Sequence, residues 1–317
     1  MSEPVVFLNG QIVPASEAHL KIYDAGIVLG ATVTDFLRTF HHELFRLDDH
    51  LERLTRSLKY VHFEIGMSMD GLADVGRELV GHNSQLIDRE DELGLIYFIT
   101  PGEYPTYAGS SGHAVRIGPT VCAHTFRIPF ELWADKMQTG MHLVTSSIRH
   151  VPSQCYDSNM KHRSRMHYYL ADHEARLVDP NACALLLDLD GNVTETGGAN
   201  FLIVEKGTIV SPTLNNILPG ISRMVVMELA QELGIPFEER DFQVFNAINA
   251  EEAFTATTPV CATPVTRING TPIADGQPGP IYRQLMEAWS REVDLDIVRQ
   301  IINGAKRHAE SQQIVSA

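Results

Sequence analysis

Short apolar runs separated by polar turns open the chain, and this pattern predicts β-hairpins. The stretch VVFLNGQIVPA sets Asn9-Gly10 between two apolar runs, and an Asn-Gly pair in that place is a strong hairpin signal. Residues 31–47, ATVTDFLRTFHHELFRL, predict two more strands around a turn. The chain is therefore expected to begin with paired strands.

After residue 47 the apolar residues take a helical spacing instead of forming short runs. In LDDHLERLTRSLKYVHF, apolar residues recur every three or four positions, which predicts an amphipathic helix that Asp48 or Asp49 caps. A second helix is expected over DGLADVGRELVGHN, and buried strands over ELGLIYFIT and GHAVRIGPTVCAH. We therefore expect a small α+β domain over residues 1–125.

Residues 126–317 predict a larger domain that is rich in strands. A crossing segment, TFRIPFELWADKMQTG, leads into it. The expected elements are a strand over 141–151, a helix over 163–178, strands over 182–212, a helix over 222–235 that Ser222 caps and Gly234 ends, strands over 251–274, and a helix over 281–293. The tail after about residue 300 is expected to be frayed.

Composition limits the partners of this chain. Its 317 residues carry a formal net charge of −15, whereas nucleic acids and anionic membranes bind basic surfaces, so neither is expected as a partner. Four cysteines without CxxC spacing indicate reduced thiols, a cytoplasmic location and no metal site of the zinc type. We also expect neither a signal peptide nor a membrane-spanning segment, because the chain has no long apolar run.

Two motifs suggest chemistry but have simpler explanations. DLDGN at residues 188–192 resembles the start of a calcium loop, but the position that requires glutamate holds Ala199 and strands flank the motif, so a hairpin turn is favoured. SNMK at residues 158–161 matches the S-x-x-K pattern of acyl-serine enzymes, although the partner motif K-T-G is absent. A serine acyl-enzyme at Ser158 is kept as a distant alternative.

Three further features suggest a site when they are taken together. In LPGISRMVVMELA a glycine leads directly into a helix, whose first N–H groups and dipole favour an anion. Thr257 and Thr258 in TATTPV follow a strand and offer hydroxyls, and Glu195 in VTETGGAN adjoins Gly197-Gly198, where a flat group can approach the backbone. Taken singly, these features are also explained by an ordinary helix end, a polar turn and an exposed glutamate.

Pyridoxal 5′-phosphate (PLP) is one ligand that would use all three features. Its phosphate suits the helix end and the threonines, its pyridine nitrogen requires a carboxylate, and its aldehyde requires a lysine. Lys161 lies just before the helix expected over residues 163–178. The positive end of that helix dipole would disfavour the ammonium form of Lys161 and so favour the reactive amine.

The chain resembles the class IV, fold-type IV PLP-dependent aminotransferases, which include branched-chain and D-amino-acid aminotransferases and aminodeoxychorismate lyases. The motifs that carry the resemblance are FLNGQIV, LFRLDDHLERL, MKHRSRMHYYLADHEA, ALLLDLDGNVTETGGANFLIV, LPGISR and TATTPVCATPVTRINGTPI, in the order found in the family. It implies an α+β fold with a small N-terminal domain, a larger C-terminal domain and PLP between them. It also implies a homodimer.

The resemblance assigns roles to individual residues. Lys161 would be joined to the cofactor aldehyde and would move the substrate proton, and Glu195 would pair with the pyridine nitrogen. The residues expected to bind the phosphate are Arg53, Ile221, Ser222, Thr257 and Thr258.

Substrate choice is less defined, with branched-chain L-amino acids and 2-oxo acids as the first expectation. The strand GLIYFITPG lacks the Tyr-x-Arg-Pro pattern of branched-chain enzymes, and the loop EYPTYAG lacks the Arg-x-His pair of D-amino-acid enzymes. The usual tyrosine near the cofactor's phenolic oxygen falls at Arg165 or Met166, away from Tyr168. D-amino-acid transamination and aminodeoxychorismate lysis therefore stay open.

Arg38 in FLRTF matches an arginine of branched-chain enzymes and is the candidate for binding the substrate carboxylate. A strand arginine that faces solvent is the alternative.

Overall fold

A computed structural model describes residues 3–109 and 118–316, with side chains up to residue 310. The chain divides into two compact units. The first unit comprises Met1–Ile128 and Met160–Ser164, and the second comprises Pro129–Asn159 and Arg165–Ala317. The short segment Met160–Ser164 thus joins the first unit, although the sequence analysis placed it within the second domain.

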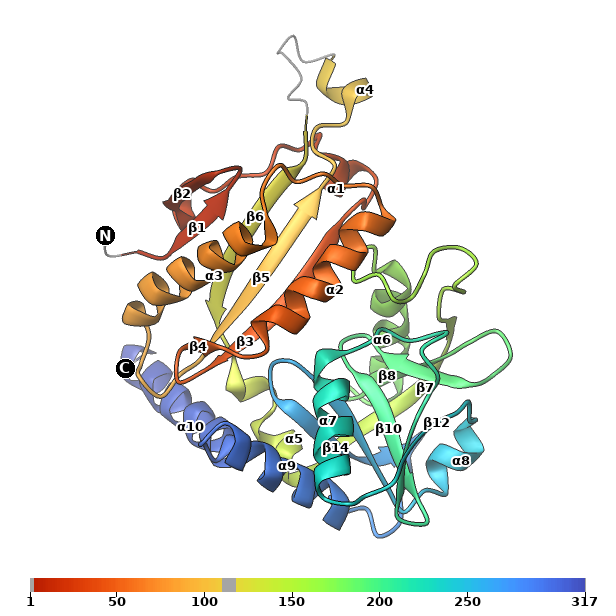
Figure 1. Ribbon diagram of the computed structural model, residues 1–317. Helices are drawn as coiled ribbons and strands as arrows, with labels where there is room; N and C mark the ends of the chain where they lie inside the picture. Colours follow the sequence, from red (N-terminus) through yellow and green to blue (C-terminus); the bar gives the residue numbers. More distant parts are fainter. Residues whose placement is uncertain (1–2, 110–117, 317) are drawn as a thin grey trace. The chain divides into compact units, whose positions relative to one another are not determined.

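An antiparallel sheet forms the first unit, with the strand order β2-β1-β6-β5-β3-β4. Helices α2 and α3 cover one face of it (Figure 1). The strands are β1 (Val5–Leu8), β2 (Gln11–Pro14), β3 (Val33–Phe40), β4 (Glu43–Leu44), β5 (Leu93–Thr100) and β6 (Thr120–Arg127). The helices are α1 (Ala25–Val28), α2 (Leu47–Tyr60), α3 (Met69–Asn83) and α4 (Pro105–Ala108).

Both hairpins predicted at the start of the chain are confirmed. Asn9 and Gly10 adopt positive φ angles between β1 and β2, as the two central residues of a tight hairpin turn must. His41 and His42 do the same between β3 and β4. The predicted strand over residues 112–124 falls partly outside the described residues, and its described part lies in β6.

The predicted cap of α2 is wrong, whereas its apolar face is confirmed. Leu51, Leu54 and Leu58 are buried on the sheet. The N-cap is Arg46, in a left-handed conformation and without a side-chain hydrogen bond to the helix. Both aspartates proposed as caps lie in the first turn instead, where their charge stabilises the positive end of the helix dipole.

A curved sheet forms the second unit, in the order β12-β11-β10-β13-β14-β7-β8-β9, with β15 beside β14. Because β9 also pairs with β10, through Glu195 and Asn200, six of these strands close into a ring. The strands are β7 (Met141–Arg149), β8 (Cys183–Leu187), β9 (Val193–Thr196), β10 (Asn200–Glu205), β11 (Thr208–Ser211), β12 (Phe237–Glu239), β13 (Glu252–Thr257), β14 (Cys261–Ile268) and β15 (Thr271–Pro272).

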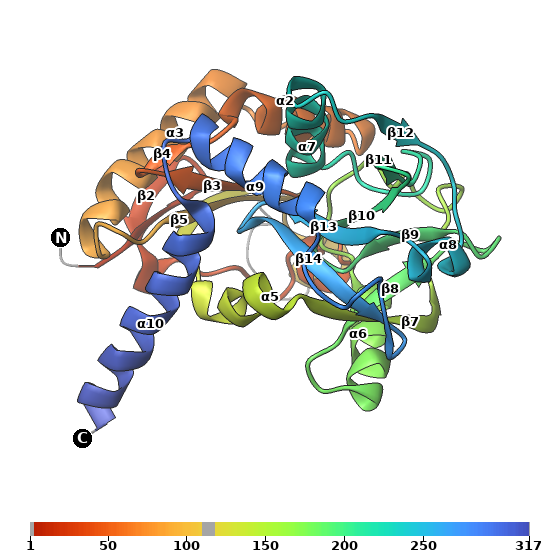
Figure 2. The same ribbon diagram turned by 90° about the horizontal axis from the view of Figure 1, so that it is seen from below.

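Helices cover the outside of this ring. Helices α7 and α9 lie against β13, and α6 lies against β7 and β8 (Figure 2). The helices of the second unit are α5 (Ala134–Thr139), α6 (Met166–Val178), α7 (Ile221–Glu232), α8 (Val244–Ile248), α9 (Pro280–Glu292) and α10 (Ile297–Ser316). Within the described residues, none of these helices or those of the first unit has the length and apolar character that crossing a membrane requires.

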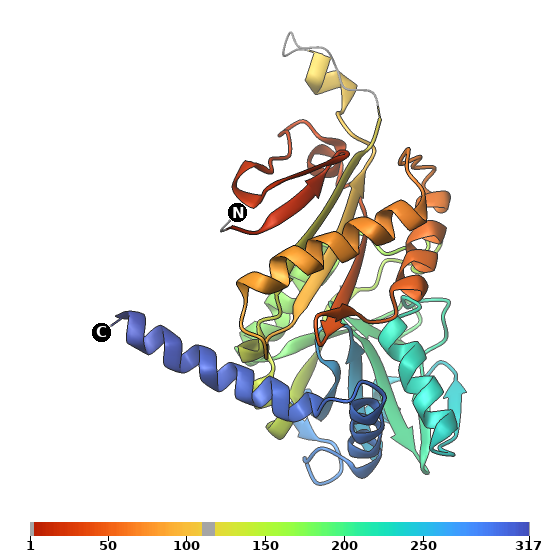
Figure 3. The ribbon, with the colours of Figure 1, turned by 60° about the vertical axis from the view of Figure 1, so that its left-hand side comes forward.

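The C-terminal tail is helical, so the expectation of a frayed tail is wrong. Helix α10 extends over Ile297–Ser316 (Figure 3). Ile297 and Ile301, one turn apart, are fully buried, and the Asp296 side chain accepts a hydrogen bond from the N–H of Arg299. Gly304 allows close packing, because a Cβ there would lie 2.7 Å from the ring of Phe130. Burial against the rest of the unit, rather than local propensity, stabilises this helix.

Candidate functional site

The backbone around Lys161 is fixed within the first unit. Its carbonyl accepts a hydrogen bond from the N–H of Thr34 on β3 at 3.0 Å, and its N–H donates to Oγ of Ser57 on α2 at 3.3 Å. Helix α6 begins at Met166, not at residue 163. A helix dipole acts mainly within the first turn, so the expected effect of this helix on Lys161 loses its basis.

Arg53 on α2 is buried beside an aspartate that the sequence analysis did not single out. Its Nε donates to Oδ2 of Asp35 at 3.0 Å, and its Nη2 donates to Oδ1 at 2.7 Å. Nδ1 of His50 lies 2.7 Å from the same Oδ1. This bidentate pair fixes the plane of the guanidinium group that the resemblance assigns to the phosphate.

The protonation of this cluster follows from burial and charge. Burial acts to raise the pKa of Asp35, but the charges and hydrogen bonds of Arg53 and His50 together outweigh it and hold that pKa well below its usual range. Burial lowers the pKa of His50, although the neighbouring Asp35 opposes this. Asp35 is therefore the ionised counter-charge of Arg53, and His50 donates its Nδ1 hydrogen to Asp35 as a neutral ring.

Arg38 on β3 is only 2% exposed, so the alternative of a solvent-facing arginine is wrong. Its Nε donates to the carbonyl of Thr39 at 3.0 Å, and its guanidinium carbon lies 3.8 Å from the centre of the Phe40 ring. These contacts fix the side chain inside the first unit. Its role toward a substrate carboxylate stays a prediction.

In the second unit, Glu195 on β9 is a buried carboxylate on which three donors converge. Tyr168 Oη donates to Oε1 at 2.7 Å, while Asn200 Nδ2 and the N–H of Leu218 donate to Oε2 at 2.9 and 3.2 Å. The alternative of an exposed strand-end glutamate is therefore wrong. Since a carboxylate oxygen accepts two hydrogen bonds, Oε1 retains capacity for one more donor.

Asn200 also holds the start of α7 close to Glu195. Its Nδ2 donates to the carbonyl of Leu218 at 2.9 Å, and a Cβ on Gly220 would lie 2.0 Å from its Oδ1. Gly220 is the N-cap of α7, so Ser222 is not the cap, and no side chain caps the first N–H groups. That helix end provides N–H donors for an anion, at Ile221 and Ser222.

The threonine turn joins the same group of residues. Thr257 ends β13, and its Oγ1 donates to the carbonyl of Gly198 at 2.8 Å. Thr258 follows in the turn, and both threonines are half-buried. A Cβ built on Gly198 would meet no atom within 4 Å, so open space adjoins this backbone. Glu195, the start of α7 and the two threonines are thus linked through residues 198–200.

The residues present fit PLP. The second unit supplies a carboxylate with capacity for a ring N–H, an uncapped helix end and two hydroxyls, which match the nitrogen and the phosphate of the cofactor. The first unit supplies Lys161 and the oriented guanidinium of Arg53.

Sequence reasoning missed the residues that support this site. Asn200 and Tyr168 lie inside motifs that were recognised, but nothing local shows their partners. Asp35 and His150 lie outside those motifs, in stretches that were predicted to be strands. A polar side chain among apolar strand residues, such as Asp35 in VTDFL, is the one signal that could have indicated a buried pair.

The two competing motifs are structural in the second unit. The Asp188 side chain accepts hydrogen bonds from the N–H groups of Asp190 and Asn192, which confirms the hairpin turn, and the described residues contain no acidic, histidine or cysteine group suited to a metal ion. Ser158 Oγ donates to the carbonyl of Asn215 at 3.2 Å, a partner that cannot act as a base. This contact gives no support to a serine acyl-enzyme.

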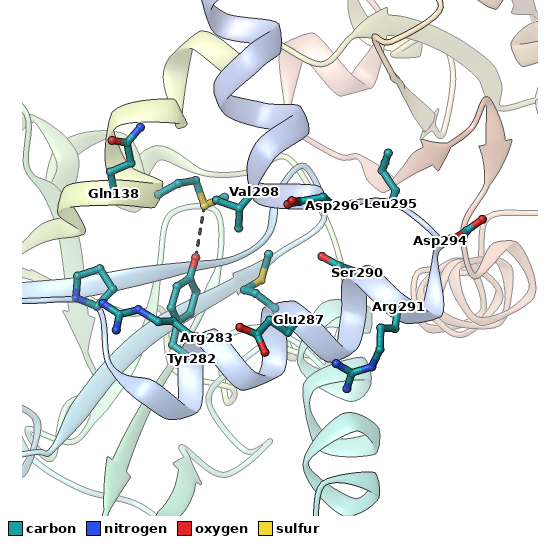
Figure 4. A pocket seen from close by; sticks show the side chains of 13 residues that line it. Gln138, Tyr282, Arg283, Glu287, Ser290, Arg291, Asp294, Leu295, Asp296 and Val298 are labelled. Carbon is teal, nitrogen blue, oxygen red and sulfur yellow. Dashed lines mark hydrogen bonds between the residues drawn. The ribbon is translucent and has the colours of Figure 1, made fainter.

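A cavity of about 910 Å³ lies elsewhere in the second unit, beside α9 and the start of α10 (Figure 4). Tyr282 and Glu287 contribute to its wall, and Tyr282 Oη donates to the sulfur of Met137. None of the residues proposed for the site lines it.

Comparison with known proteins identifies the family. The sequence model of the family "Amino-transferase class IV" matches residues 32–268. The chain belongs to the class IV aminotransferases. Enzymes of this family use PLP, and this aminotransferase therefore catalyses PLP-dependent transamination.

Relatives of this aminotransferase differ in substrate. It is 31% identical over 293 residues to the D-alanine aminotransferase of Staphylococcus aureus (strain N315), which covers 91% of this chain and 98% of the relative. The branched-chain aminotransferase of Thermoproteus uzoniensis, solved with norvaline, is 26% identical with a TM-score of 0.80, covering 92% and 94% of the two chains. The branched-chain aminotransferase of Escherichia coli shares the fold, at 23% identity and a TM-score of 0.77, covering 90% and 93% of the two chains.

Proposed function

We propose that this aminotransferase binds PLP through Lys161 and Arg53 of the first unit. In the second unit, Glu195, the start of α7 and the two threonines of the turn after β13 complete the proposed site. The observation that supports this most is the buried Glu195, because three donors orient it and one oxygen has capacity for a further N–H. When bound, PLP supplies an aldehyde that reacts with amines and a ring that withdraws electrons from the substrate.

Each residue then has a distinct task. Lys161 would hold the cofactor at its aldehyde carbon, and the Nζ of Lys161 would move the proton at the substrate Cα. Glu195 keeps the proton on the ring nitrogen, which preserves the electron-withdrawing power of the ring. The groups proposed to hold the phosphate are the Arg53 guanidinium, the N–H groups of Ile221 and Ser222, and the hydroxyls of Thr257 and Thr258.

We propose a small D-amino acid of the D-alanine type as the amino donor and a 2-oxo acid as the acceptor. The full-length similarity to the Staphylococcus aureus enzyme supports the D series. Branched-chain L-amino acids are the second candidate, supported by the likeness to the Thermoproteus uzoniensis enzyme. Arg38 is the candidate for the substrate carboxylate only under this second proposal.

The test is a matched panel of D- and L-amino acids with pyruvate or 2-oxoglutarate. We expect turnover of D-alanine, and turnover confined to branched-chain L-amino acids would support the second candidate instead. Pyruvate release from aminodeoxychorismate would indicate the lyase. Borohydride treatment should fix the cofactor to the peptide that contains Lys161, and labelling of another lysine would contradict the proposed site.

We also propose that the protein is a cytoplasmic homodimer. Met166, Tyr169 and Leu177 form an exposed apolar row along α6, and such rows commonly mark contacts with another chain. All four cysteines are free, as a reducing compartment would keep them. One chain has a mass of 35.3 kDa, so light scattering should give twice that value. A monomer at micromolar concentration would contradict the dimer.

A further inference from the structure

Two buried residues of the second unit, His150 and Tyr168, form a hydrogen-bonded row with Glu195. His150, which follows β7, and Tyr168, on α6, are both buried. Nε2 of His150 lies 3.0 Å from Oη of Tyr168 and 3.7 Å from Oε1 of Glu195. The three side chains therefore form a short hydrogen-bonded row that ends at the carboxylate.

The hydrogens in this row can be counted. Nδ1 of His150 lies 3.0 Å from the carbonyl of Val151, which only accepts, so Nδ1 carries a hydrogen. The phenol of Tyr168 has a single hydrogen, and it is donated to Glu195. The remaining contact, from Nε2 to Oη, is a hydrogen bond only if Nε2 also carries a hydrogen.

The phenol keeps that hydrogen at neutral pH. Burial raises the pKa of Tyr168 well above its usual value, and the charge of Glu195 raises it further. Three other ionisable groups lie near the row. The guanidinium of Arg165 lies 4.9 Å from the centre of the Tyr168 ring, and the ring of His167 lies 5.7 Å from that of His150. Tyr156, in the loop between β7 and α6, acts on Tyr168 in the same direction as Glu195.

We infer that His150 is a positioning residue, protonated on both ring nitrogens, that holds Glu195 as an oriented carboxylate through Tyr168. This inference rests on the proposed role of Glu195 toward the cofactor. The positive ring offsets the negative charge of Glu195, and a buried charge is costly unless it is paired and hydrogen-bonded. If the ring were neutral, the Tyr168 hydrogen would turn to Nε2, and Glu195 would lose one of its three donors.

Nitrogen NMR of the histidine rings tests the protonation directly, in the full chain with and without cofactor. At about pH 7.5, where an ordinary histidine with a pKa of about 6.5 is mostly neutral, we expect one ring with both nitrogens protonated. That signal should disappear in His150→Gln and persist in His173→Gln, which changes an exposed histidine on α6. A neutral His150 ring in either form of the protein would overturn the inference.

The functional consequence is tested with His150→Gln and Tyr168→Phe. We expect kcat to fall by about tenfold with a nearly unchanged KM, because each substitution removes a hydrogen bond that orients Glu195 and leaves the substrate contacts in place. The visible absorption of the bound cofactor should also change its pH dependence in both variants, which a purely structural defect would not produce. His173→Gln should match the unmodified enzyme.

Glu195→Gln separates the two proposals. If this variant keeps full activity and colour, the proposed role of Glu195 fails. If it loses activity while His150→Gln behaves like His173→Gln in kcat and in absorption, only the role of His150 fails. Thermal unfolding of each variant identifies any that has merely lost its fold.

Discussion

Arg53 and Asp35 form a buried ion pair in the first unit, joined by hydrogen bonds of 3.0 and 2.7 Å between helix α2 and strand β3. The guanidinium group proposed to bind phosphate is thus oriented by a carboxylate behind it. Both side chains are almost completely buried, so neither charge is compensated by solvent if the other is removed.

Asp35→Asn should therefore destabilise the protein by about 3–5 kcal/mol, because it leaves the charge of Arg53 buried without its partner. PLP affinity should fall as well, since the guanidinium loses its fixed orientation. Urea unfolding and cofactor titration measure the two effects. Asp74→Asn, which removes the exposed partner of Arg77, is the matched control and should change stability by less than about 0.5 kcal/mol. Equal effects in the two variants would contradict the structural role of the pair.

The same pair should make the first unit sensitive to acid. Asp35 has a lowered pKa in the folded state, so its contribution to stability is present above its unfolded pKa of about 3.9 and is lost as the pH falls through the folded value. The lowered pKa of His50 acts in the same direction from a higher pH, because below about pH 6.5 the imidazole is protonated in the unfolded state before it is protonated in the folded state. The free energy of unfolding should therefore fall steeply below about pH 5, and less steeply in Asp35→Asn. Identical slopes would remove Asp35 from this account.

Lys161→Ala should abolish transamination, because no other group is proposed to move the proton at the substrate Cα. The groups proposed to hold the phosphate are untouched, so the variant should still bind PLP noncovalently. Turnover assays and absorption spectra after borohydride treatment measure both properties. Lys59→Ala, on the exposed face of α2, should retain activity and labelling. Near-normal turnover in Lys161→Ala would exclude Lys161 from the mechanism.

Gly220→Ala should weaken cofactor binding without touching a proposed ligand. The new Cβ would lie 2.0 Å from Oδ1 of Asn200 and would force that side chain away from Glu195 and Leu218. We expect a loss of about 1–3 kcal/mol in stability, from overpacking, and a raised dissociation constant for PLP. Gly81→Ala is the contrasting control, because its Cβ meets nothing within 4 Å and an alanine should stabilise α3 by about 0.5–1 kcal/mol. Unchanged PLP affinity in Gly220→Ala would show that Asn200 does not position the site.

Ile301→Ala should destabilise the second unit by about 2–5 kcal/mol, the usual cost of emptying a fully buried aliphatic position. Ile302→Ala, at the half-buried neighbouring position of α10, should have a smaller effect. Chemical denaturation measures both. If the tail were frayed, as the sequence suggested, neither substitution would change stability.

Local patterns determined much of the fold. Turn chemistry at Asn9-Gly10, the apolar spacing of α2 and the short apolar runs of the strands were readable because each signal depends on neighbours within a few residues. Motif order along the chain also indicated the class IV aminotransferases and a PLP site. The tail was misread because α10 is stabilised by burial of Ile297 and Ile301, which a local pattern does not reveal.

The sequence by itself thus determined the elements, the family and the residue types that suit PLP. Only the tertiary structure decided which side chains support them: Asp35 meets Arg53 across 18 residues, and Tyr168 meets Glu195 across 27. It also decided that the backbone of Lys161 is fixed to β3 and α2 of the first unit. These partners lie far apart in the sequence and meet only when the strands and helices of each unit pack together. Burial then requires each polar group to be paired with a complementary group nearby.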